Sequence, residues 1–378
     1  MVYDVIVAGV GGMGSAAVWQ LARRGKRVLG LEQFDIPHVM GSSHGVTRII
    51  RLPYHESPDY VPLLRRAYEL WRDLERTSGS EILVITGSID ASREGHSPFQ
   101  GALESAQLHG IEHQILSGRE VNARFPGYRL PADFAALFQP QGGFIASERA
   151  IVAHVIAAQG LGAEIHAREP LLRWQAGPGG EGVVVTTAQG RYEAASLILT
   201  CGAWMGDVAP ILKDKAVPER QVLAWLQPRQ PEFFAPDRFP VFNMQVDEGR
   251  FYGLPIYEVP GFKFGRYHHL GESGPVDTIR RDPDSRDEAL LRNFAEKYFP
   301  LGSGPTMALR GCLFTNTPDE HFVIDLHPEH PQVVLASPCS GHGYKFCSVI
   351  GEILADLAGE NRRSRHEIGF LGLARLTS

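Results

Sequence analysis

Residues 5–14 read VIVAGVGGMG, a run of four apolar residues followed at once by a glycine-rich turn. A continuous apolar run is typical of a strand that is buried on both faces of a parallel sheet. The glycines at positions 9, 11 and 14 match the spacing G-x-G-x-x-G, and the residues after them, up to Gly25, predict a helix. This order predicts a nucleotide-binding α/β unit, because the helix N-terminus offers free N–H groups to a pyrophosphate.

A second predicted strand, residues 27–32, ends in an acidic side chain, Glu32. An acid at this distance from the turn can accept hydrogen bonds from both ribose hydroxyls and would repel a 2′-phosphate. The pattern does not separate FAD from NAD. The residues that we predict to bind the dinucleotide here are Gly9, Gly11, Gly12, Met13, Gly14 and Glu32.

A second glycine turn, residues 340–346 (SGHGYKF), opens a predicted terminal helix. An FAD protein could place N–H groups here against the flavin ring, whereas an NAD enzyme has no obvious use for such a turn. We therefore predict FAD, with Gly341, Gly343 and Lys345 beside it. By composition alone, a plain loop-to-helix turn is an equal alternative.

The composition excludes several classes of protein. The 378 residues include 37 Lys and Arg against 43 Asp and Glu, a formal charge of −6, which argues against a nucleic-acid partner. No apolar run approaches the roughly 20 residues that span a bilayer, and residues 1–4 carry no basic leader. Four cysteines without framework spacing and histidines without zinc spacing predict a cytoplasmic protein with no metal site.

The strand pattern predicts a mixed α/β protein of two domains. Apolar strands of the parallel type lie at both ends of the chain and near residue 200, whereas proline and aromatic residues are dense in between. We expect a Rossmann-like FAD-binding domain assembled from residues 1–84, 145–215 and 310–378. Residues 85–144 and 216–309 form the predicted sheet-rich substrate domain.

Four longer helices are predicted outside the first unit. The spacing of apolar residues predicts them from Ser57 to Gly79, over 147–159, from residue 285 and over 348–358. For the third, Ser285 and Glu288 predict a capping box.

Six blocks of the chain, in order, resemble the family of monomeric sarcosine oxidase and N-methyltryptophan oxidase. The blocks are 4–7 (DVIV) with the glycine turn, 41–51 (GSSHGVTRIIR), 60–63 (YVPL), 310–312 (RGC), 319–330 (DEHFVIDLHPEH) and 340–346. The resemblance implies a two-domain flavoprotein of the D-amino-acid-oxidase type. It also implies a monomer that oxidises secondary amino acids with O2 and releases H2O2.

The resemblance implies a role for several residues around the flavin. Cys312 matches a cysteine that bonds the flavin 8α-methyl through a thioether, which makes the cofactor covalent. Lys263 matches a lysine that activates O2, because a nearby cation stabilises charge developing on oxygen. Ser43, His44 and Arg48 match residues near the flavin ring.

The resemblance also implies a substrate site. Arg51 and Lys345 match the pair that binds the substrate carboxylate, since an Arg fork suits a planar carboxylate and Lys adds a point charge. Tyr252 matches an active-site tyrosine. The family's active-site histidine matches His268 or His269, and we favour His268.

The chain departs from the family pattern at two positions beside the substrate site and carries one extra residue. Arg266 is inserted before Tyr267 and makes the histidine register ambiguous. Phe314 stands where the family has a tyrosine, and Cys339 where an aromatic residue is common. Both changes leave room for a larger or cyclic amine than sarcosine.

Together these patterns predict an FAD-dependent oxidase of N-methyl or other secondary amino acids. Hydride passes to flavin N5, water hydrolyses the imine, and O2 takes the electrons to give H2O2. The alternatives are a dehydrogenase that passes electrons to a carrier, an NAD-dependent dehydrogenase and a non-catalytic flavin-binding module.

Overall fold

The computed structural model describes residues 2–376, which form two eight-stranded sheets and one three-stranded sheet. The α-helices are α1 (Gly12–Arg23), α2 (Val61–Ser78), α3 (Phe99–Leu108), α4 (Gly118–Arg124), α5 (Ser147–Gln159), α6 (Met205–Val208), α7 (Ser285–Tyr298) and α8 (Cys347–Leu357). The predicted mixed α/β class is confirmed.

The first large sheet is built on the opening strand of the chain. Its strands are β1 (Val2–Ala8), β2 (Val28–Leu31), β9 (Glu164–His166), β10 (Arg173–Ala176), β11 (Val183–Thr186), β12 (Arg191–Leu199), β18 (Val323–Leu326) and β19 (Val333–Ser337). β1 pairs in parallel with β2 and with β12, and β12 pairs in parallel with β19. The carboxyl ends of these strands therefore meet at one edge, where open α/β sheets bind their ligands.

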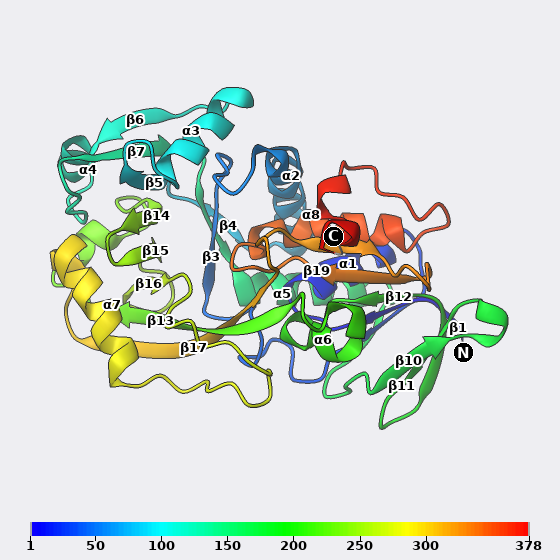
Figure 1. Ribbon diagram of the computed structural model, residues 1–378. Coiled ribbons are helices and arrows are strands. Elements are labelled where there is room, and N and C mark those ends of the chain that lie inside the picture. The colour runs from blue at the N-terminus through cyan, green and yellow to red at the C-terminus, as the bar shows by residue number, and fades with distance from the viewer. Residues whose placement is uncertain (1, 377–378) are drawn as a thin grey trace.

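Both faces of β1 are buried, as its apolar run predicts. Val5 and Val7 pack into one hydrophobic cluster, which includes residues of α1, α2, α5 and α8. Ile6 and Ala8 pack into another cluster on the opposite face. Figure 1 shows α1 and α8 lying together beside this sheet.

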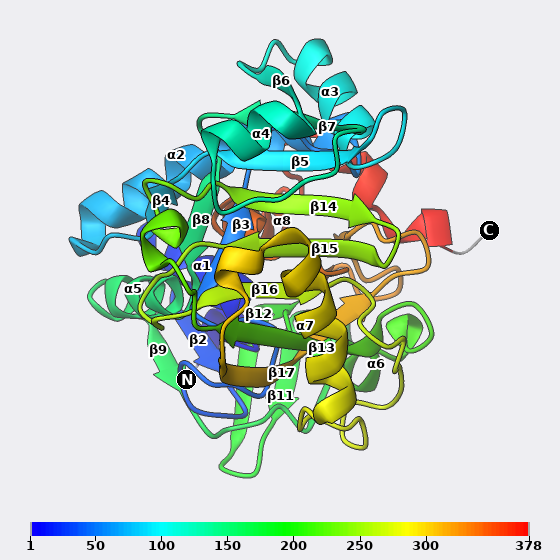
Figure 2. The same ribbon diagram turned by 90° about the vertical axis from the view of Figure 1, so that its left-hand side faces the viewer.

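The second large sheet forms the other lobe of the molecule. In order of pairing its strands are β17 (Thr306–Asn316), β13 (Val217–Leu226), β16 (Phe262–Arg266), β15 (Gly249–Leu254), β14 (Val241–Val246), β5 (Ser88–Arg93), β7 (Phe134–Gln139) and β6 (Gln114–Ser117). Figure 2 shows α7 lying across the outer face of this sheet. Its hydrophobic cluster is rich in phenylalanine and includes Phe242, Phe262 and Phe294.

A small third sheet carries residues of segment 41–51 and contains β3 (Thr47–Ile50), β4 (Leu83–Ile85) and β8 (Gly143–Ala146). β3 pairs antiparallel with β8. Figure 1 places β3 between the two lobes. Arg48 and Arg51 are thereby held at the junction of the two large sheets.

The chain enters the second sheet twice, first with β5, β6 and β7 and later along two neighbouring strands. β13 leads into the second sheet and β17 leads out of it, and the two pair antiparallel with Val217 opposite Asn316. The predicted division into domains stays a proposal; the strand that carries residues 310–316 pairs within the second sheet. Within residues 2–376, no helix is long and apolar enough to cross a membrane.

The predicted helices form, with differences at their ends. A 3-10 turn, Pro58–Tyr60, precedes α2, and Ser57 accepts a hydrogen bond from the N–H of Asp59. The capping box of α7 consists of Asp284 and Asp287, so the prediction of Ser285 and Glu288 was wrong by one residue. Asp284 wins because its carboxylate accepts two backbone N–H groups, from Arg286 and Asp287.

Candidate active site

One large cavity brings together most of the residues that the sequence predicts for the cofactor. It lies at the carboxyl ends of β1 and β12 and extends to β15 and β17 of the second sheet. Predicted residues that line it are Gly9, Gly11, Gly12, Met13, Glu32, Ser43, Arg48, Tyr252, Cys312, Gly341, Gly343 and Lys345. The cavity wall does not include five other predicted residues, namely Gly14, His44, Arg51, Lys263 and His268.

The first glycine turn packs closely against the end of β12. Gly9 has a φ of +89°, and a Cβ there would lie 2.5 Å from the carbonyl oxygen of Thr200. At Gly14, a Cβ would lie 1.7 Å from the carbonyl oxygen of Gly9. Gly12 donates its N–H to Ser43 Oγ at 3.2 Å. The turn therefore brings backbone N–H groups at the start of α1 to the cavity wall.

Glu32 reaches the cavity with its carboxylate held by the backbone. Oε2 accepts the N–H of Val10 at 2.8 Å, and Oε1 accepts the N–H of Phe34 at 3.0 Å. The side chain is almost fully buried. This geometry leaves acceptor capacity for hydroxyl groups beside the turn, as the sequence predicts.

The second glycine turn closes the opposite side of the cavity. A Cβ at Gly343 would lie 1.7 Å from the carbonyl oxygen of Pro338, and one at Gly341 would lie 2.5 Å from the ring of Phe314. The turn leads into a short 3-10 helix, Tyr344–Phe346, and then into α8. Lys345 is buried at this point.

Cys312 is a buried thiol of β17 beside two basic side chains. Burial would raise the pKa of Cys312, but His44 and Arg48 outweigh burial and hold it at about 7. Arg48 Nη2 lies 3.7 Å from the sulfur and also donates to the carbonyl oxygen of Ser42. By contrast, burial raises the pKa of Cys339, another thiol of the cavity wall, to about 12. Cys312 is therefore the thiol poised to act as a nucleophile.

Lys263 projects from β16 toward the loop that precedes β3. Its ammonium donates to the carbonyl oxygens of Gly45 at 2.7 Å and Thr47 at 2.6 Å, and to Thr47 Oγ1 at 3.1 Å. Burial, followed by the charge of Arg48, lowers the pKa of Lys263 well below its usual value. Thr47 lines the cavity, so Lys263 lies directly behind a residue of the cavity wall.

Two buried cations meet at the ring of Tyr54. Arg51 Cζ lies 4.9 Å and Lys345 Nζ 5.2 Å from its centroid. Lys345 donates to the carbonyl oxygen of His342 at 2.6 Å, and burial chiefly lowers its pKa to about 7. Of the predicted carboxylate-binding pair, Lys345 thus lies on the cavity wall, and Arg51 lies behind the wall near the same ring.

The three residues after β16, Tyr267 to His269, lie in different surroundings, and the structure brings neither candidate histidine to the cavity. Tyr267 lines the cavity, with its ring near those of Tyr252 at 5.2 Å and Phe314 at 5.6 Å. His268 is about half exposed and lies between two glutamates, Glu219 at 2.8 Å and Glu320 at 3.0 Å. These two contacts raise the pKa of His268 to about 9. The assignment of His268 to catalysis stays a prediction.

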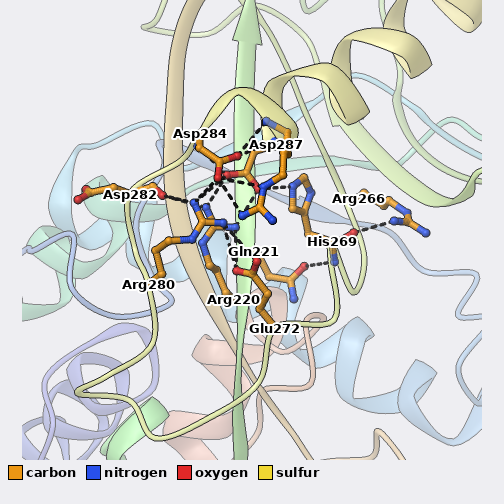
Figure 3. Close-up of polar contacts among 10 residues, drawn as sticks. Arg220, Gln221, Arg266, His269, Glu272, Arg280, Asp282, Asp284 and Asp287 are labelled. Atoms are coloured by element: carbon orange, nitrogen blue, oxygen red, sulfur yellow. Dashed lines mark hydrogen bonds and ion pairs between the residues drawn. The ribbon is translucent and has the colours of Figure 1, made fainter.

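His269 does not line the cavity, and its side chain lies in a buried ionic cluster, drawn in Figure 3. Its Nε2 lies 3.0 Å from Asp287 Oδ1, and Asp287 also accepts two hydrogen bonds from Arg220. Arg266 donates to the carbonyl oxygen of His269 at 2.6 Å. The cluster anchors the loop that presents Tyr267, because it ties the loop to β13 and α7.

Sequence reasoning missed two parts of the cavity wall. Tyr267 was not among the predicted residues, although the histidines beside it were. Residues 200–204 (TCGAW) also line the cavity. Their signal was available, since they follow the buried strand 197–199 and ligands bind at the carboxyl ends of parallel strands.

The residues present fit FAD. The two glycine turns face one cavity, one beside a carboxylate suited to a ribose and the other beside the thiol and the cations that suit a flavin ring. The buried Ser42 hydroxyl, also on the wall, has no hydrogen-bond partner within residues 2–376, which leaves it for a ligand. No cluster of metal-binding side chains is found within the same residues.

Comparison with known proteins agrees with this geometry. The family described as "DAO: FAD dependent oxidoreductase" matches residues 4–357. A monomeric sarcosine oxidase from Streptomyces avermitilis is 40% identical over 385 aligned residues, covering 100% of this chain and 98% of its own. An N-methyl-L-tryptophan oxidase from Yersinia pestis is 31% identical, covering 99% of this chain and 100% of its own.

Among solved structures, one similar protein is NikD, an unusual amino acid oxidase essential for nikkomycin biosynthesis. It superposes with a TM-score of 0.82 at 26% sequence identity, over 98% of this chain and 97% of its own. The likeness extends through both lobes of the molecule.

Proposed function

This chain belongs to the DAO family of FAD-dependent oxidoreductases, and we propose that it oxidises N-methyl or other secondary amino acids with O2 as the electron acceptor. The observation that carries the proposal is a pair of buried cations near the ring of Tyr54, with Lys345 on the cavity wall and Arg51 behind it. An amino acid carboxylate is the group that such a pair recognises. A monomer in the cytoplasm, acting on a small molecule, is part of the proposal.

The substrate carboxylate binds the free donors of this pair. Arg51 Nε and Nη2 are already engaged by Asp90, His55 and Glu56, and Nη1 forms no hydrogen bond with any residue from 2 to 376. Lys345 has a third N–H available after its bonds to Tyr54 and His342. A carboxylate held between Nη1 and Nζ is fixed in both position and orientation.

Aromatic residues then enclose the amine. Tyr252, Tyr267 and Phe314 contribute three rings to the same wall. When bound, FAD would supply the redox chemistry, namely two-electron oxidation of the amine to an imine, which water hydrolyses, with the electrons passed on to O2 to give H2O2. The chain itself supplies binding, orientation and charge.

Lys263 is the residue that we assign to oxygen. It is held rigidly by Gly45 and Thr47 and lies 5.6 Å from the centroid of Trp225. In its protonated form, Lys263 is a fixed cation that stabilises negative charge developing on O2. We also propose that Cys312 carries the flavin as a thioether, because a thiol with a pKa of about 7 is largely competent as a thiolate at neutral pH.

The proposal is tested with purified holoenzyme and a panel of amines. Sarcosine, N-methyltryptophan, pipecolate, proline and D-amino acids are screened for aerobic H2O2 formation and for anaerobic bleaching of the flavin. Oxidation of secondary amino acids with release of H2O2 supports the proposal. Bleaching without H2O2 indicates a dehydrogenase instead, and no bleaching with any amine overturns the proposed substrate class.

The Lys263→Met variant tests the acceptor. We expect anaerobic bleaching to persist and the rate of reoxidation by O2 to fall by roughly 100-fold or more, since one preorganised charge is lost. Unchanged H2O2 production would show that Lys263 has no part in oxygen reduction.

A further inference from the structure

Arg51 is paired within the protein with a carboxylate that does not line the cavity. Asp90 lies on β5, is fully buried, and accepts Arg51 Nε on both oxygens, at 3.0 and 3.2 Å. Asn243 Nδ2 donates to the same carboxylate at 3.3 Å. Burial raises the pKa of Asp90 and Arg51 opposes this rise; the hydrogen bonds from Arg51 and Asn243 favour the ionised carboxylate.

A second carboxylate joins two guanidinium groups in the same cluster. Glu56 accepts Arg51 Nη2 at 3.2 Å and Arg250 Nη2 at 3.0 Å. Arg250 also donates to Asn243 and lies over the ring of Tyr267, with Cζ 3.8 Å from the centroid. Tyr267 is thus the layer that separates Arg250 from the cavity.

The cluster carries one uncompensated positive charge when Lys345 is protonated. Its cations are Arg51, Arg250 and Lys345, and its anions are Glu56 and Asp90. Burial lowers the pKa of both His55 and His342, so these imidazoles are neutral. Outside these five residues, His268 lies between Glu219 and Glu320 at a half-exposed position, and these three groups together add a net charge of −1 that solvent partly screens. One substrate carboxylate therefore balances the cluster.

We propose that Asp90 sets the charge of the substrate that this site accepts, acting as a positioning and specificity residue behind Arg51. The inference rests on the proposed function of Arg51 and Lys345. With Asp90 ionised, the site matches an amino acid of one carboxylate and a neutral side chain. A second substrate carboxylate would leave a buried excess negative charge, and an amine without a carboxylate would leave a buried excess positive charge.

The test is a change of charge without a change of shape. Asp90→Asn keeps an oxygen for Arg51 Nε and removes one negative charge. The readout is the ratio of kcat/KM for N-methylaspartate to that for N-methylasparagine, two substrates that differ only in side-chain charge. We expect this ratio to rise by about tenfold or more in the variant, because unit charges in a partly buried site interact strongly. A merely structural loss lowers both values together and leaves the ratio unchanged, which would overturn the inference.

Two further variants make the test directional. Arg250→Gln removes a positive charge and should lower the same ratio, while Arg250→Lys keeps the charge and should leave it unchanged. Ser88→Ala, two residues from Asp90 on β5, is the control for the strand itself, because the Ser88 hydroxyl has no partner within residues 2–376. A ratio that moves in Ser88→Ala as it does in Asp90→Asn would overturn the inference.

Failure of the inference can be told from failure of the proposed function. If the wild-type enzyme oxidises sarcosine but Asp90→Asn leaves the ratio unchanged, only the role of Asp90 is wrong. If neither aspartate nor asparagine derivative is oxidised, the same ratio is taken from the Kd values of malonate and malonamate, measured from the flavin absorbance of the holoenzyme. If no secondary amino acid bleaches the wild-type flavin, the proposed function itself is wrong.

Discussion

Cys312 differs from Cys339, another thiol of the cavity wall, in its electrostatic surroundings. His44 and Arg48 hold its pKa at about 7, whereas burial alone raises that of Cys339 to about 12. We predict that Cys312→Ser yields a yellow protein whose colour is released by acid precipitation. Wild type and Cys339→Ser should keep their colour in the pellet. A colourless wild-type pellet would contradict the thioether.

Lys345 makes carboxylate binding dependent on pH. Burial lowers its pKa from 10.5 to about 7, so without a ligand the amine is protonated below pH 7 and neutral above it. A bound carboxylate favours the protonated form. The affinity for malonamate should therefore be full below pH 7 and fall by about tenfold per pH unit above it. Lys345→Met should bind weakly at every pH; the same fall in that variant would assign it to another group.

The residue roles could be predicted from the sequence only where a local pattern carried them. The glycine turns and Glu32 are local, and the structure brings them to one cavity. The contacts of Asp90 with Arg51 and of Arg250 with Tyr267 join residues from four separate segments, and neither has a local signature. The extra residue Arg266 leaves the histidine register open, because His268 and His269 lie in the turn after β16, where the alternation of a strand no longer sets which face a side chain takes.

At the scale of elements, α7 is fastened to β13 through Asp287. Burial would raise the pKa of Asp287, but Arg220, the N–H of Asp284 and His269 hold it well below its ordinary value of 3.8. Its contribution to stability is therefore complete above that value and is lost as the pH falls below it.

Asp287→Asn should lower the free energy of unfolding by about 3–5 kcal/mol at pH 7, because it removes the buried carboxylate that pairs with Arg220 and leaves only the more distant, partly exposed Glu272. The difference from wild type should shrink at pH 3 in urea unfolding. Asp284→Asn is the matched control and should cost less than about 0.5 kcal/mol, since Asn is as good an N-cap as Asp. Equal effects of the two variants would contradict the fastening role.

Helix ends illustrate what local sequence leaves undecided. The apolar spacing predicts the body of α7, but Asp284 and Ser285 are both good N-cap residues, and the box starts at Asp284. The carboxylate of Asp287 decides which residue begins the capping box, and Arg220 of β13 holds that carboxylate in place. A long-range contact thus fixes a boundary that sequence reasoning placed one residue later.

At the scale of the whole molecule, the cavity wall draws on both lobes. Gly12 comes from α1 beside the first sheet, and Tyr252 and Cys312 come from the second. Because FAD binds only the folded state, we expect it to stabilise both lobes, by about 2.7 kcal/mol at 100 times its Kd. Cys312→Ser stripped of flavin and then reloaded should regain amide-exchange protection in both α1 and β15. Protection confined to α1 would show that the flavin contacts one lobe alone.

The sequence predicted the fold class of the molecule but not the order in which its strands pair. The apolar strands near residues 5, 198 and 334 do meet in one parallel sheet. The second sheet recruits β5, β6 and β7 from an earlier part of the chain, and its order depends on packing around the phenylalanine-rich cluster. Such packing has no signature in any one segment.

Because β13 and β17 pair with each other, residues 217–316 form a segment that could be exchanged as a unit between relatives. The segment enters and leaves the second lobe at neighbouring residues, Val217 and Asn316, so its ends need no linker to span a gap. It carries Lys263, Tyr252, Tyr267 and Cys312 together. Replacing this segment in one relative with the segment of another would transfer these four residues in a single step. The pairing of β14 with β5 is the main contact that would have to be matched.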